Sequence, residues 1–479
     1  MLRLRLEFYK PCGLMKTTLI SHASLLIQSD NTTVLTDPVF FDYLWEECNV
    51  HCPSIDLDLE KLPVIDVLNI SHRHQDHFDI RTLAHIANSS TILAEDAIVL
   101  APRDEILLEV LKELEFKNVT VVEDFKAIEY KDITLTPTPS LNQQDYFPEH
   151  GLLVHDGSVT IWNQVDTIVS PDIIKYIHRL YGQPDMAHMR YLPLLEGNFC
   201  FHNPVELPMD EYSSFLKVAG ACRPKFVVPG SAGFRYRDEF KFLNQYSFPT
   251  TQEQFLRDLK NFCPEINSSV FYPGDVASIT KEGVKISRGD SHFVKIKEDD
   301  EYRIEFKPVL EVPPIRTQTK DQNESDKEWN EVVDYIENQF VEKVVQKKAV
   351  QSWVEWQVVY QIEVFGLKSS QIWCLDFAGE DAAIIKGRVG KINLYEGIAC
   401  SELYRLIHQE TSWDYVGING QYRTFKDIYR IQLGEFEKWD GDSKEKFPQP
   451  LTELFPAGTE MDRTKFMRDV RRWKSNLKP

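Results

Sequence analysis

The chain has 479 residues, of which 42% are hydrophobic, and a formal net charge of −20 at pH 7. A chain of this length buries a large core and is expected to form about two or three domains. The acidic balance argues against a nucleic-acid or anionic-membrane partner, because both require a basic surface. It leaves room for a local basic pocket that binds an anionic small-molecule substrate.

The sequence carries no signal for export or membrane insertion. No apolar run approaches the roughly 20 residues of a membrane span. Residues 1–9 alternate polar and apolar side chains like an edge strand and lack the unbroken apolar core of a signal peptide. The eight cysteines are scattered without a repeated spacing, which favours free thiols in a reducing compartment. A cytoplasmic location is therefore expected.

Two strands are predicted near the start of the chain, at residues 17–27 and 32–35, joined by a tight turn at residues 29–31. Asp37 ends the second strand. His22 lies within the first strand, where a packed, hydrogen-bonded histidine is expected rather than a metal ligand. Further on, a compact group of Cys48, His51 and Cys52 lacks the fourth ligand that a structural zinc site requires.

The motif Ser-His-Arg-His-Gln-Asp-His-Phe-Asp at residues 71–79 directly follows an apolar run of strand length. His72 and His74 lie on one side of an extended backbone, whereas the adjacent Asp76 and His77 point apart and can serve a second centre. Imidazole and carboxylate groups suit zinc, iron or manganese, held singly or as a pair about 3.5–4 Å apart. The alternative is a histidine-rich surface loop.

The pattern His-x-His-x-Asp-His after a strand resembles that of the metallo-β-lactamase superfamily. The resemblance implies an α/β fold of the αββα sandwich type, in which two sheets pack face to face and helices cover both outer surfaces. The opening hairpin and Asp37 precede the motif in the order of the superfamily. The following elements suit this fold, with helices predicted at residues 80–87 and 104–114 and strands at residues 91–93, 119–122 and 133–136.

Asp166 follows two further predicted strands, at residues 152–154 and 159–162. The resemblance implies a carboxylate at this place that bridges two metals, and Asp166 is the candidate. The alternative is an aspartate that caps a turn. 

The sequence departs from the common pattern of the superfamily at two places. The histidine expected before the hairpin is replaced by Phe147, with His150 nearby, and the late strand at residues 226–228 leads into a loop without histidine. One metal is then absent, or other residues complete the ligand shell. His150 is the predicted substitute because Pro148 and Gly151 allow the loop to bend. The other substitutes considered are Glu149, His188 and His202.

These departures are similar to those of one branch, the catalytic part of CMP-N-acetylneuraminate hydroxylases. The likeness is diffuse outside the metal loop, although it covers most of residues 15–430. That family also carries an N-terminal Rieske iron–sulfur domain held by two cysteines and two histidines, and no such pairs precede His72. Any oxygenase chemistry would therefore need electrons from a separate protein. The segments that carry the likeness are residues 147–149, 163–166, 223–229, 272–275, 395–398 and 413–414.

A composition break divides the chain into a catalytic domain at residues 1–312, a polar linker at residues 313–330 and a smaller α+β domain at residues 331–479. The second domain is predicted to contain a helix at residues 329–345, a long strand at residues 353–365 and a helix at residues 395–407. Its tryptophans and tyrosines are expected to be core residues rather than the lining of an organic-ligand pocket. The charged tail after residue 441 is expected to dock loosely.

Three functions are compatible with the sequence, and a metal-dependent hydrolase is ranked first. His72 and His74 would hold one divalent ion, zinc or iron, and Asp76 and His77 a second, with Asp166 between them. Bound water would lose its proton near neutral pH and attack an ester, amide or phosphodiester, with Asp76 as the catalytic base.

A non-haem iron monooxygenase with an electron-donor protein is ranked second, because no electron-transfer module is present. A non-catalytic binding protein on a decayed enzyme fold is ranked last, because all four loop ligands are retained.

Overall fold

The protein is described from a computed structural model at residues 13–141, 147–200, 206–307, 311, 313–379, 383–439 and 447–476. The predicted N-terminal edge strand and His202 lie outside the described residues. The described part of the N-terminal region is built around two sheets whose inner faces share one hydrophobic cluster. Leu25 and Val67 enter this cluster from one sheet, and Leu152 and Met186 enter it from the other.

The first sheet has eight strands and the second has seven. In spatial order the first contains β18 (Gly283–Ser287), β17 (Val276–Thr280), β1 (Met15–Ser21), β2 (Ser24–Gln28), β3 (Thr33–Thr36), β6 (Ile65–Asn69), β7 (Leu93–Ala101) and β8 (Val119–Val121). The second contains β16 (Asn267–Ser268), β14 (Phe226–Gly230), β13 (Met186–Arg190), β12 (Thr160–Asn163), β11 (His150–His155), β10 (Ile133–Pro139) and β9 (Ile128–Tyr130).

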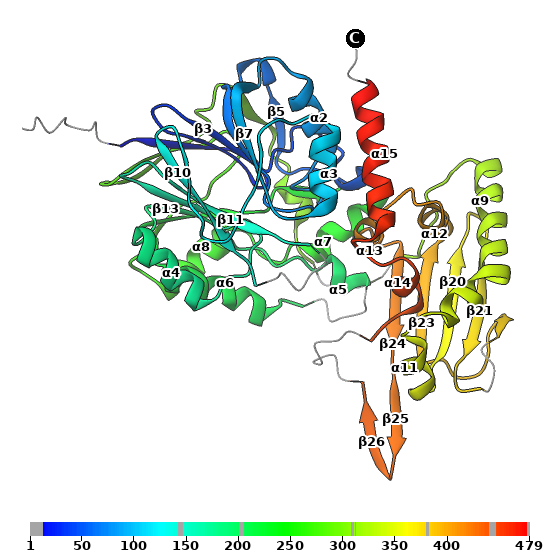
Figure 1. The fold of residues 1–479 in the computed structure, drawn as a ribbon. Helices are drawn as coiled ribbons and strands as arrows, with labels where there is room; N and C mark the ends of the chain where they lie inside the picture. The colour runs from blue at the N-terminus through cyan, green and yellow to red at the C-terminus, as the bar shows by residue number, and fades with distance from the viewer. Residues whose placement is uncertain are drawn as a thin grey trace, which may run out of the picture.

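Helices cover the outer faces of both sheets, so that the predicted αββα sandwich is confirmed (Figure 1). On the first sheet, α2 (Ile80–Asn88) and α3 (Glu105–Glu113) bury their apolar stripes. Asp104 caps α3, because its side chain accepts a hydrogen bond from the backbone N–H of Leu107. The second sheet is covered by α4 (Pro171–Tyr181), α6 (Met209–Cys222) and α8 (Gln252–Phe262).

Short elements complete this part of the chain. Two small antiparallel pairs lie outside the main sheets, β4 (Asn49–His51) with β15 (Phe234–Tyr236) and β5 (Ser54–Leu57) with β19 (Val294–Glu298). The remaining helical segments are α1 (Leu44–Glu47), η1 (Leu59–Lys61), α5 (Glu196–Cys200), η2 (Asp238–Leu243), α7 (Asn244–Ser247) and η3 (Glu301–Ile304).

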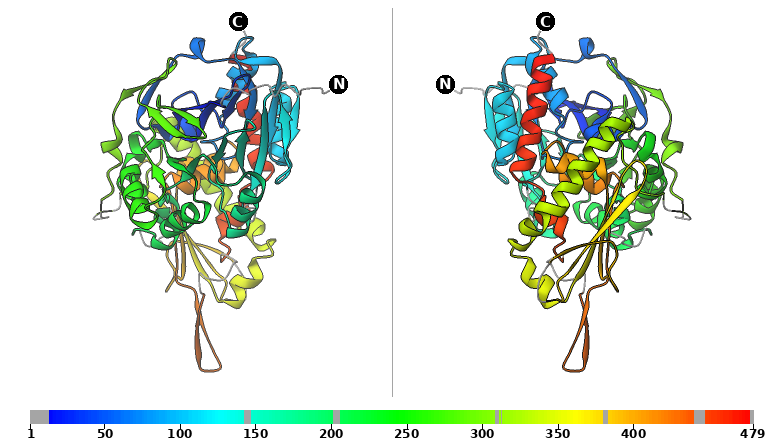
Figure 2. Two further views of the ribbon diagram at one scale, coloured as in Figure 1. Left: turned by 90° about the vertical axis from the view of Figure 1, so that its left-hand side faces the viewer. Right: turned by 90° about the vertical axis from the view of Figure 1, so that its right-hand side faces the viewer.

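The C-terminal region contains a separate five-stranded sheet, in the order β22 (Ile384–Lys386), β21 (Ser370–Asp376), β20 (Val359–Phe365), β23 (Leu394–Ala399) and β24 (Tyr422–Lys426). A hairpin of β25 (Tyr429–Gln432) and β26 (Glu435–Lys438) projects from it (Figure 2). The helical segments are α9 (Gln322–Tyr335), η4 (Ile336–Phe340), α10 (Val341–Val345), α11 (Val350–Glu355), α12 (Cys400–Ile407), α13 (Trp413–Ile418), α14 (Pro450–Leu454) and α15 (Glu460–Asn476).

Several predicted elements have different bounds in the structure. The first predicted strand is a hairpin of β1 and β2, which turns at His22 and Ala23. The predicted strand at residues 353–365 begins as α11, because Val350 and Trp353 have helical spacing and Trp353 is fully buried. The predicted helix at residues 395–407 begins as β23, which pairs with β20 and β24.

The division into domains stays a prediction. Helix α9 begins at Gln322, inside the stretch expected to be a linker. One hydrophobic cluster contains Trp162 of the sandwich together with Trp353 and Trp413 of the C-terminal region. The two parts therefore pack against each other through apolar side chains. Among the described residues, no helix combines the length and apolarity that crossing a membrane requires.

The expected loose docking of the tail is wrong. Helix α15 lies alongside α2 and α3 (Figure 1). Phe466 and Val470 of α15 belong to the same hydrophobic cluster as the apolar faces of those two helices. The tail was misjudged because its charges dominate its composition, whereas a few apolar residues at helical spacing decide its position.

We expect Phe466→Ala to lower the free energy of unfolding by about 3–5 kcal/mol, because the buried ring packs 5.9 Å from that of Phe78 in the sandwich. Urea titration followed by circular dichroism measures the change. Arg471→Ala, an exposed position on the same helix, is the control. Equal effects of the two variants would mean that α15 is not part of the sandwich core.

Candidate metal centre

The loop at residues 71–79, here called the metal loop, leaves the end of β6 and leads into α2. Strands β3 and β6 are parallel neighbours with Thr36 opposite Asn69, so Asp37 and the metal loop emerge at the same edge of the sheet. The loop then turns at His74, whose carbonyl oxygen accepts hydrogen bonds from the backbone N–H groups of His77 at 3.0 Å and Phe78 at 2.8 Å. This turn brings the ends of the motif close together.

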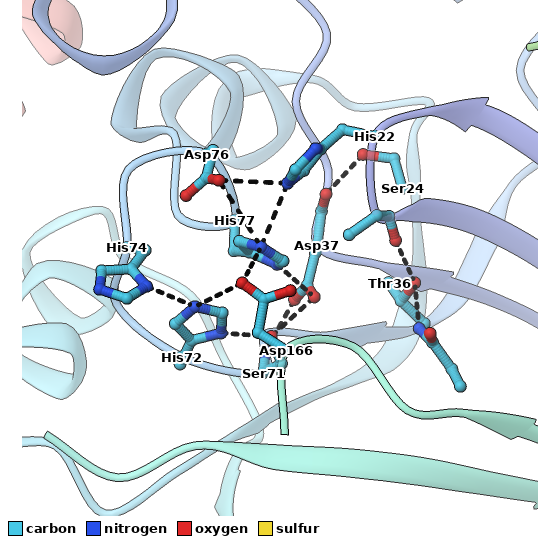
Figure 3. A network of polar contacts seen from close by, with 12 residues as sticks. His22, Ser24, Thr36, Asp37, Ser71, His72, His74, Asp76, His77 and Asp166 are labelled. Carbon is cyan, nitrogen blue, oxygen red and sulfur yellow. Dashed lines mark hydrogen bonds and ion pairs between the residues drawn. The ribbon is translucent and has the colours of Figure 1, made fainter. Parts of the chain in front are cut away.

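Six side chains gather at this edge in two groups with the donor types of metal sites (Figure 3). Within each group, the ligand atoms lie within 4.8 Å of one another. One group contains His72, His74 and Asp166, and the other contains His22, Asp76 and His77.

Asp166 connects the two groups. Its Oδ2 atom lies 3.4 Å from His77 Nε2 and 4.0 Å from His72 Nε2. Val165, the residue before it, has a left-handed φ of 55°, which turns the chain after β12 toward the metal loop. The pairing of His72 with His74 and of Asp76 with His77, as well as the central place of Asp166, follows the sequence prediction; their role as ligands stays a prediction.

Asp37 orients His77 directly and His72 through Ser71. Its Oδ1 accepts the backbone N–H of Ser71 at 2.7 Å, and its Oδ2 accepts Ser71 Oγ at 2.7 Å and His77 Nδ1 at 3.1 Å. Ser71 Oγ lies 2.9 Å from His72 Nδ1 and accepts its proton, having donated its own to Asp37. The Nε2 atoms of His72 and His77 are therefore left to face the centre.

The charges at the centre are strongly coupled. Burial lowers the pKa of His72, and His77 and His74 lower it further. Burial opposes charge on His77, but Asp166 and Asp76 hold the pKa of His77 well above its ordinary value. Burial also opposes charge on Asp166, yet His77 and His72 hold its pKa well below its ordinary value. A proton at His77 thus balances the carboxylates, and a divalent cation would replace it.

His22 is the residue that sequence reasoning missed. Its Nε2 lies 3.2 Å from both His77 Nε2 and Asp76 Oδ2. His22 occupies the two-residue turn between β1 and β2 with a φ of 43°, and a side chain at Gly233 would collide with its backbone. The signal was the sequence Ser-His-Ala-Ser between two apolar runs, which indicates a hairpin turn rather than one strand.

His150 is not part of either group, which corrects the prediction that it completes the shell. Its Nε2 lies 3.0 Å from Asn69 Oδ1, and its backbone N–H donates to Ser71 at 3.2 Å. The pairing of His150 with Pro139 in β10 and β11 fixes this position, so the loop does not bend it toward the centre. Phe147 instead packs on the rings of His72 and His74, at centroid distances of 5.9 and 4.7 Å.

The residues present fit a divalent cation. The buried Asp76 Oδ1 has no hydrogen-bond partner among the described residues. The facing Nε2 atoms of His22 and His77 cannot bond to each other unless one carries a proton, whereas both lone pairs can bind one cation. By contrast, His51 Nδ1 forms a hydrogen bond of 2.9 Å with Asp42 Oδ1, and Cys48, His51 and Cys52 belong to neither of the two groups found among the described residues.

The fold and these two groups define a sandwich protein with two clusters of potential metal ligands at one sheet edge. Comparison with known families agrees with this class, because the model of the beta-lactamase superfamily domain matches residues 16–166. This match covers less than half of the chain.

A protein of Mycolicibacterium smegmatis named as a Rieske 2Fe-2S iron–sulfur protein is 27% identical over 188 residues, which is 37% of this chain. The chain spans about a third, 34%, of the length of this curated relative.

Solved structures with similar folds overlap just over half of the chain. CmlA, a diiron beta-hydroxylase from Streptomyces venezuelae, is 16% identical with a TM-score of 0.37, covering 57% of this chain and 55% of that one. The isothiocyanate hydrolase from Delia radicum gut bacteria is 16% identical with a TM-score of 0.37, covering 55% and 98%. The metallo-beta-lactamase fold protein YhfI from Bacillus subtilis is 12% identical with a TM-score of 0.37, covering 56% and 99%.

We expect His22→Ala to remove about one of two equivalents of bound metal, because it deletes one of three donors in its group. His150→Ala, the matched control, should keep both equivalents. Elemental analysis after chelation and reloading with zinc measures the content. Loss of metal in His150→Ala with full occupancy in His22→Ala would reverse the assignment.

The stability of the metal-free protein should fall as the pH drops below 6.5. Burial lowers the pKa of His150 from 6.5 to about 4 and that of His188 from 6.5 to about 3. The unfolded chain therefore binds protons between pH 6.5 and these values that the folded chain excludes. Between its two pKa values, each of these histidines should lower the free energy of unfolding by about 1.4 kcal/mol for each unit by which the pH falls. Urea titrations across this range should give a shallower slope for His150→Gln, and an unchanged slope would contradict the assignment.

Proposed function

We propose that the protein is a metal-dependent hydrolase with two divalent ions, one held by His72, His74 and Asp166 and the other by His22, Asp76 and His77. The observation that carries the proposal is the position of Asp166, whose Oδ2 lies near a ring nitrogen of each group. A carboxylate in this place can bridge two ions. The bond cleaved would be an ester, an amide or a phosphodiester.

The ions, when bound, would lower the pKa of coordinated water and polarise the substrate. The chain would supply the proton acceptor, Asp76. Burial opposes its charge, but His77 and His22 hold the pKa of Asp76 below its ordinary value, so it is ionised at neutral pH. Its Oδ1 is buried without a partner among the described residues and is free to accept a proton.

A cavity of about 810 Å³ adjoins the metal loop at Gln75 and Phe78, and none of the six candidate ligands lines it. Trp45, which also lines it, packs with its ring 5.6 Å from that of His74. Basic and acidic side chains line the cavity in similar numbers, among them Arg81, Arg237, Asp238 and Glu239. Charge alone therefore does not support the expectation of an anionic substrate.

A second candidate function is a non-haem iron monooxygenase similar to CMP-N-acetylneuraminate hydroxylase. One observation favours it, the similarity to a protein named as a Rieske 2Fe-2S iron–sulfur protein. Histidine and carboxylate donors suit iron as well as zinc. In this case an electron-donor protein would supply the electrons.

Metal content and an absorption spectrum of protein purified from its source distinguish the two functions. Two zinc ions together with hydrolysis of p-nitrophenyl esters or bis(p-nitrophenyl) phosphate would support the hydrolase. Two irons with charge-transfer bands, together with no hydrolysis, would support the monooxygenase instead of the hydrolase. Absence of both metals would favour a non-catalytic binding protein on a decayed enzyme fold.

We expect Asp76→Asn to lower kcat for hydrolysis by about 10²–10⁴-fold, because the amide cannot accept the proton. Asp79→Asn is the matched control, since it makes the same change in the same loop and asparagine still caps α2. Initial rates with p-nitrophenyl substrates provide the measurement. A kcat of Asp76→Asn equal to that of the control would exclude Asp76 as the base.

A further inference from the structure

The metal loop has a second face that does not contain ligands. Arg73 and Gln75 alternate with His72, His74 and Asp76 along the loop. Both are buried, with exposed fractions of 3% and 8%. Their polar groups bond to residues from the C-terminal part of the chain, and Arg73 also bonds to Asp104.

Arg73 connects the loop to two helices. Its Nε donates to Asp104 at 2.9 Å, and its Nη1 donates to Asp462 of α15 at 3.4 Å. Asp462 is completely buried. The guanidinium also lies over the rings of Phe147 and Phe466, at 5.2 and 5.7 Å. Charge and packing together fix the direction of this side chain.

Both polar atoms of the Gln75 side-chain amide form hydrogen bonds. Its Oε1 accepts a hydrogen bond from Lys465 Nζ of α15 at 2.7 Å, and its Nε2 donates to Ser412 Oγ at 3.2 Å. Lys465 is 4% exposed, and its ammonium group lies 3.0 Å from Asp469 and 3.5 Å from Glu46. An amide bonded on both sides has little freedom to rotate, so the backbone between His74 and Asp76 is held with it.

Glu46 brings a third segment into the same network. It accepts hydrogen bonds from Arg405 and Thr411, each at 2.7 Å, and from Ser412. Trp45 and Glu46 have left-handed φ values of 46° and 55°, a conformation that costs roughly 1–2 kcal/mol per residue. Such a turn persists where its surroundings hold it. Here the contacts of Glu46 keep Trp45 packed on His74.

We infer that the C-terminal part of the chain positions the metal loop, and that Asp462 and Lys465 are positioning residues for its ligands. They act through Arg73 and Gln75, which lie next to His72, His74 and Asp76 in the sequence. Buried ionic networks are a weak source of stability compared with apolar packing. Their hydrogen bonds nevertheless restrict the orientation of the groups that they join, here Arg73 and Gln75. The part of this inference that concerns metal affinity rests on the metal centre of the proposed function.

Lys465→Met tests the inference, because it keeps the length and apolar stem of the side chain and removes the donor to Gln75. Gln75→Met is the second variant, since it breaks the same contact and leaves Lys465 paired with Asp469 and Glu46. Lys474→Met is the matched control, because Lys474 also joins α15 to the sandwich, through Glu113 and Glu115, but does not touch the metal loop.

Two measurements on the full chain decide the outcome. Chelator competition with zinc should show about tenfold or greater loss of metal affinity in Lys465→Met and Gln75→Met, and none in Lys474→Met. Hydrogen exchange of the metal-free proteins should be faster at residues 71–79 in the first two variants only. Lys465→Arg, which keeps a donor, should restore most of both properties.

The inference is overturned if both methionine variants bind zinc and exchange as Lys474→Met does. Failure of the wild-type protein to bind zinc would contradict the proposed function instead, and hydrogen exchange at residues 71–79 would still decide whether Lys465 and Gln75 order the loop.

Discussion

The candidate centre depends on one buried carboxylate, that of Asp37. It stands at the end of β3 with a left-handed φ of 41°, and its backbone N–H bonds to Asn69 at the end of the neighbouring β6. From there it accepts three hydrogen bonds from the first residue of the metal loop and from His77. Removing any of these contacts would leave a buried charge partly unsatisfied, which is costly. The loop therefore starts at a fixed place and with fixed histidine orientations.

The opposite face of the loop is fixed by different means. There the partners come from α13 and α15, and the contacts of Arg73 and Gln75 cross 389 and 390 residues of sequence to reach Asp462 and Lys465. The sandwich thus determines where the ligands begin, and the C-terminal part limits how far the following residues can move. The two supports differ in kind, because one is a single carboxylate and the other a shared network of charges.

The sequence was informative where the determinants are local. The spacing of His72, His74, Asp76 and His77 directly after a strand predicted their pairing, and the helix predicted at residues 104–114 is present as α3. His22 was missed because a two-residue turn looks like the interior of a strand when both flanks are apolar. His150 was misplaced because the register of β10 against β11, which no local pattern reveals, directs it to Asn69. The docking of α15 depends on partners hundreds of residues away.

The two groups of donors differ in their access to solvent, and this difference bears on any reaction at the centre. The side chains of His22, Asp76 and His77 are 2%, 5% and 0% exposed, whereas that of Asp166 is 26% exposed. A substrate would therefore approach from the side of Asp166 and His74 and meet the first group before the second. The buried group has a low-dielectric surrounding that strengthens its electrostatic effect on Asp166. Among these four side chains, that of Asp166 is therefore the most accessible to solvent.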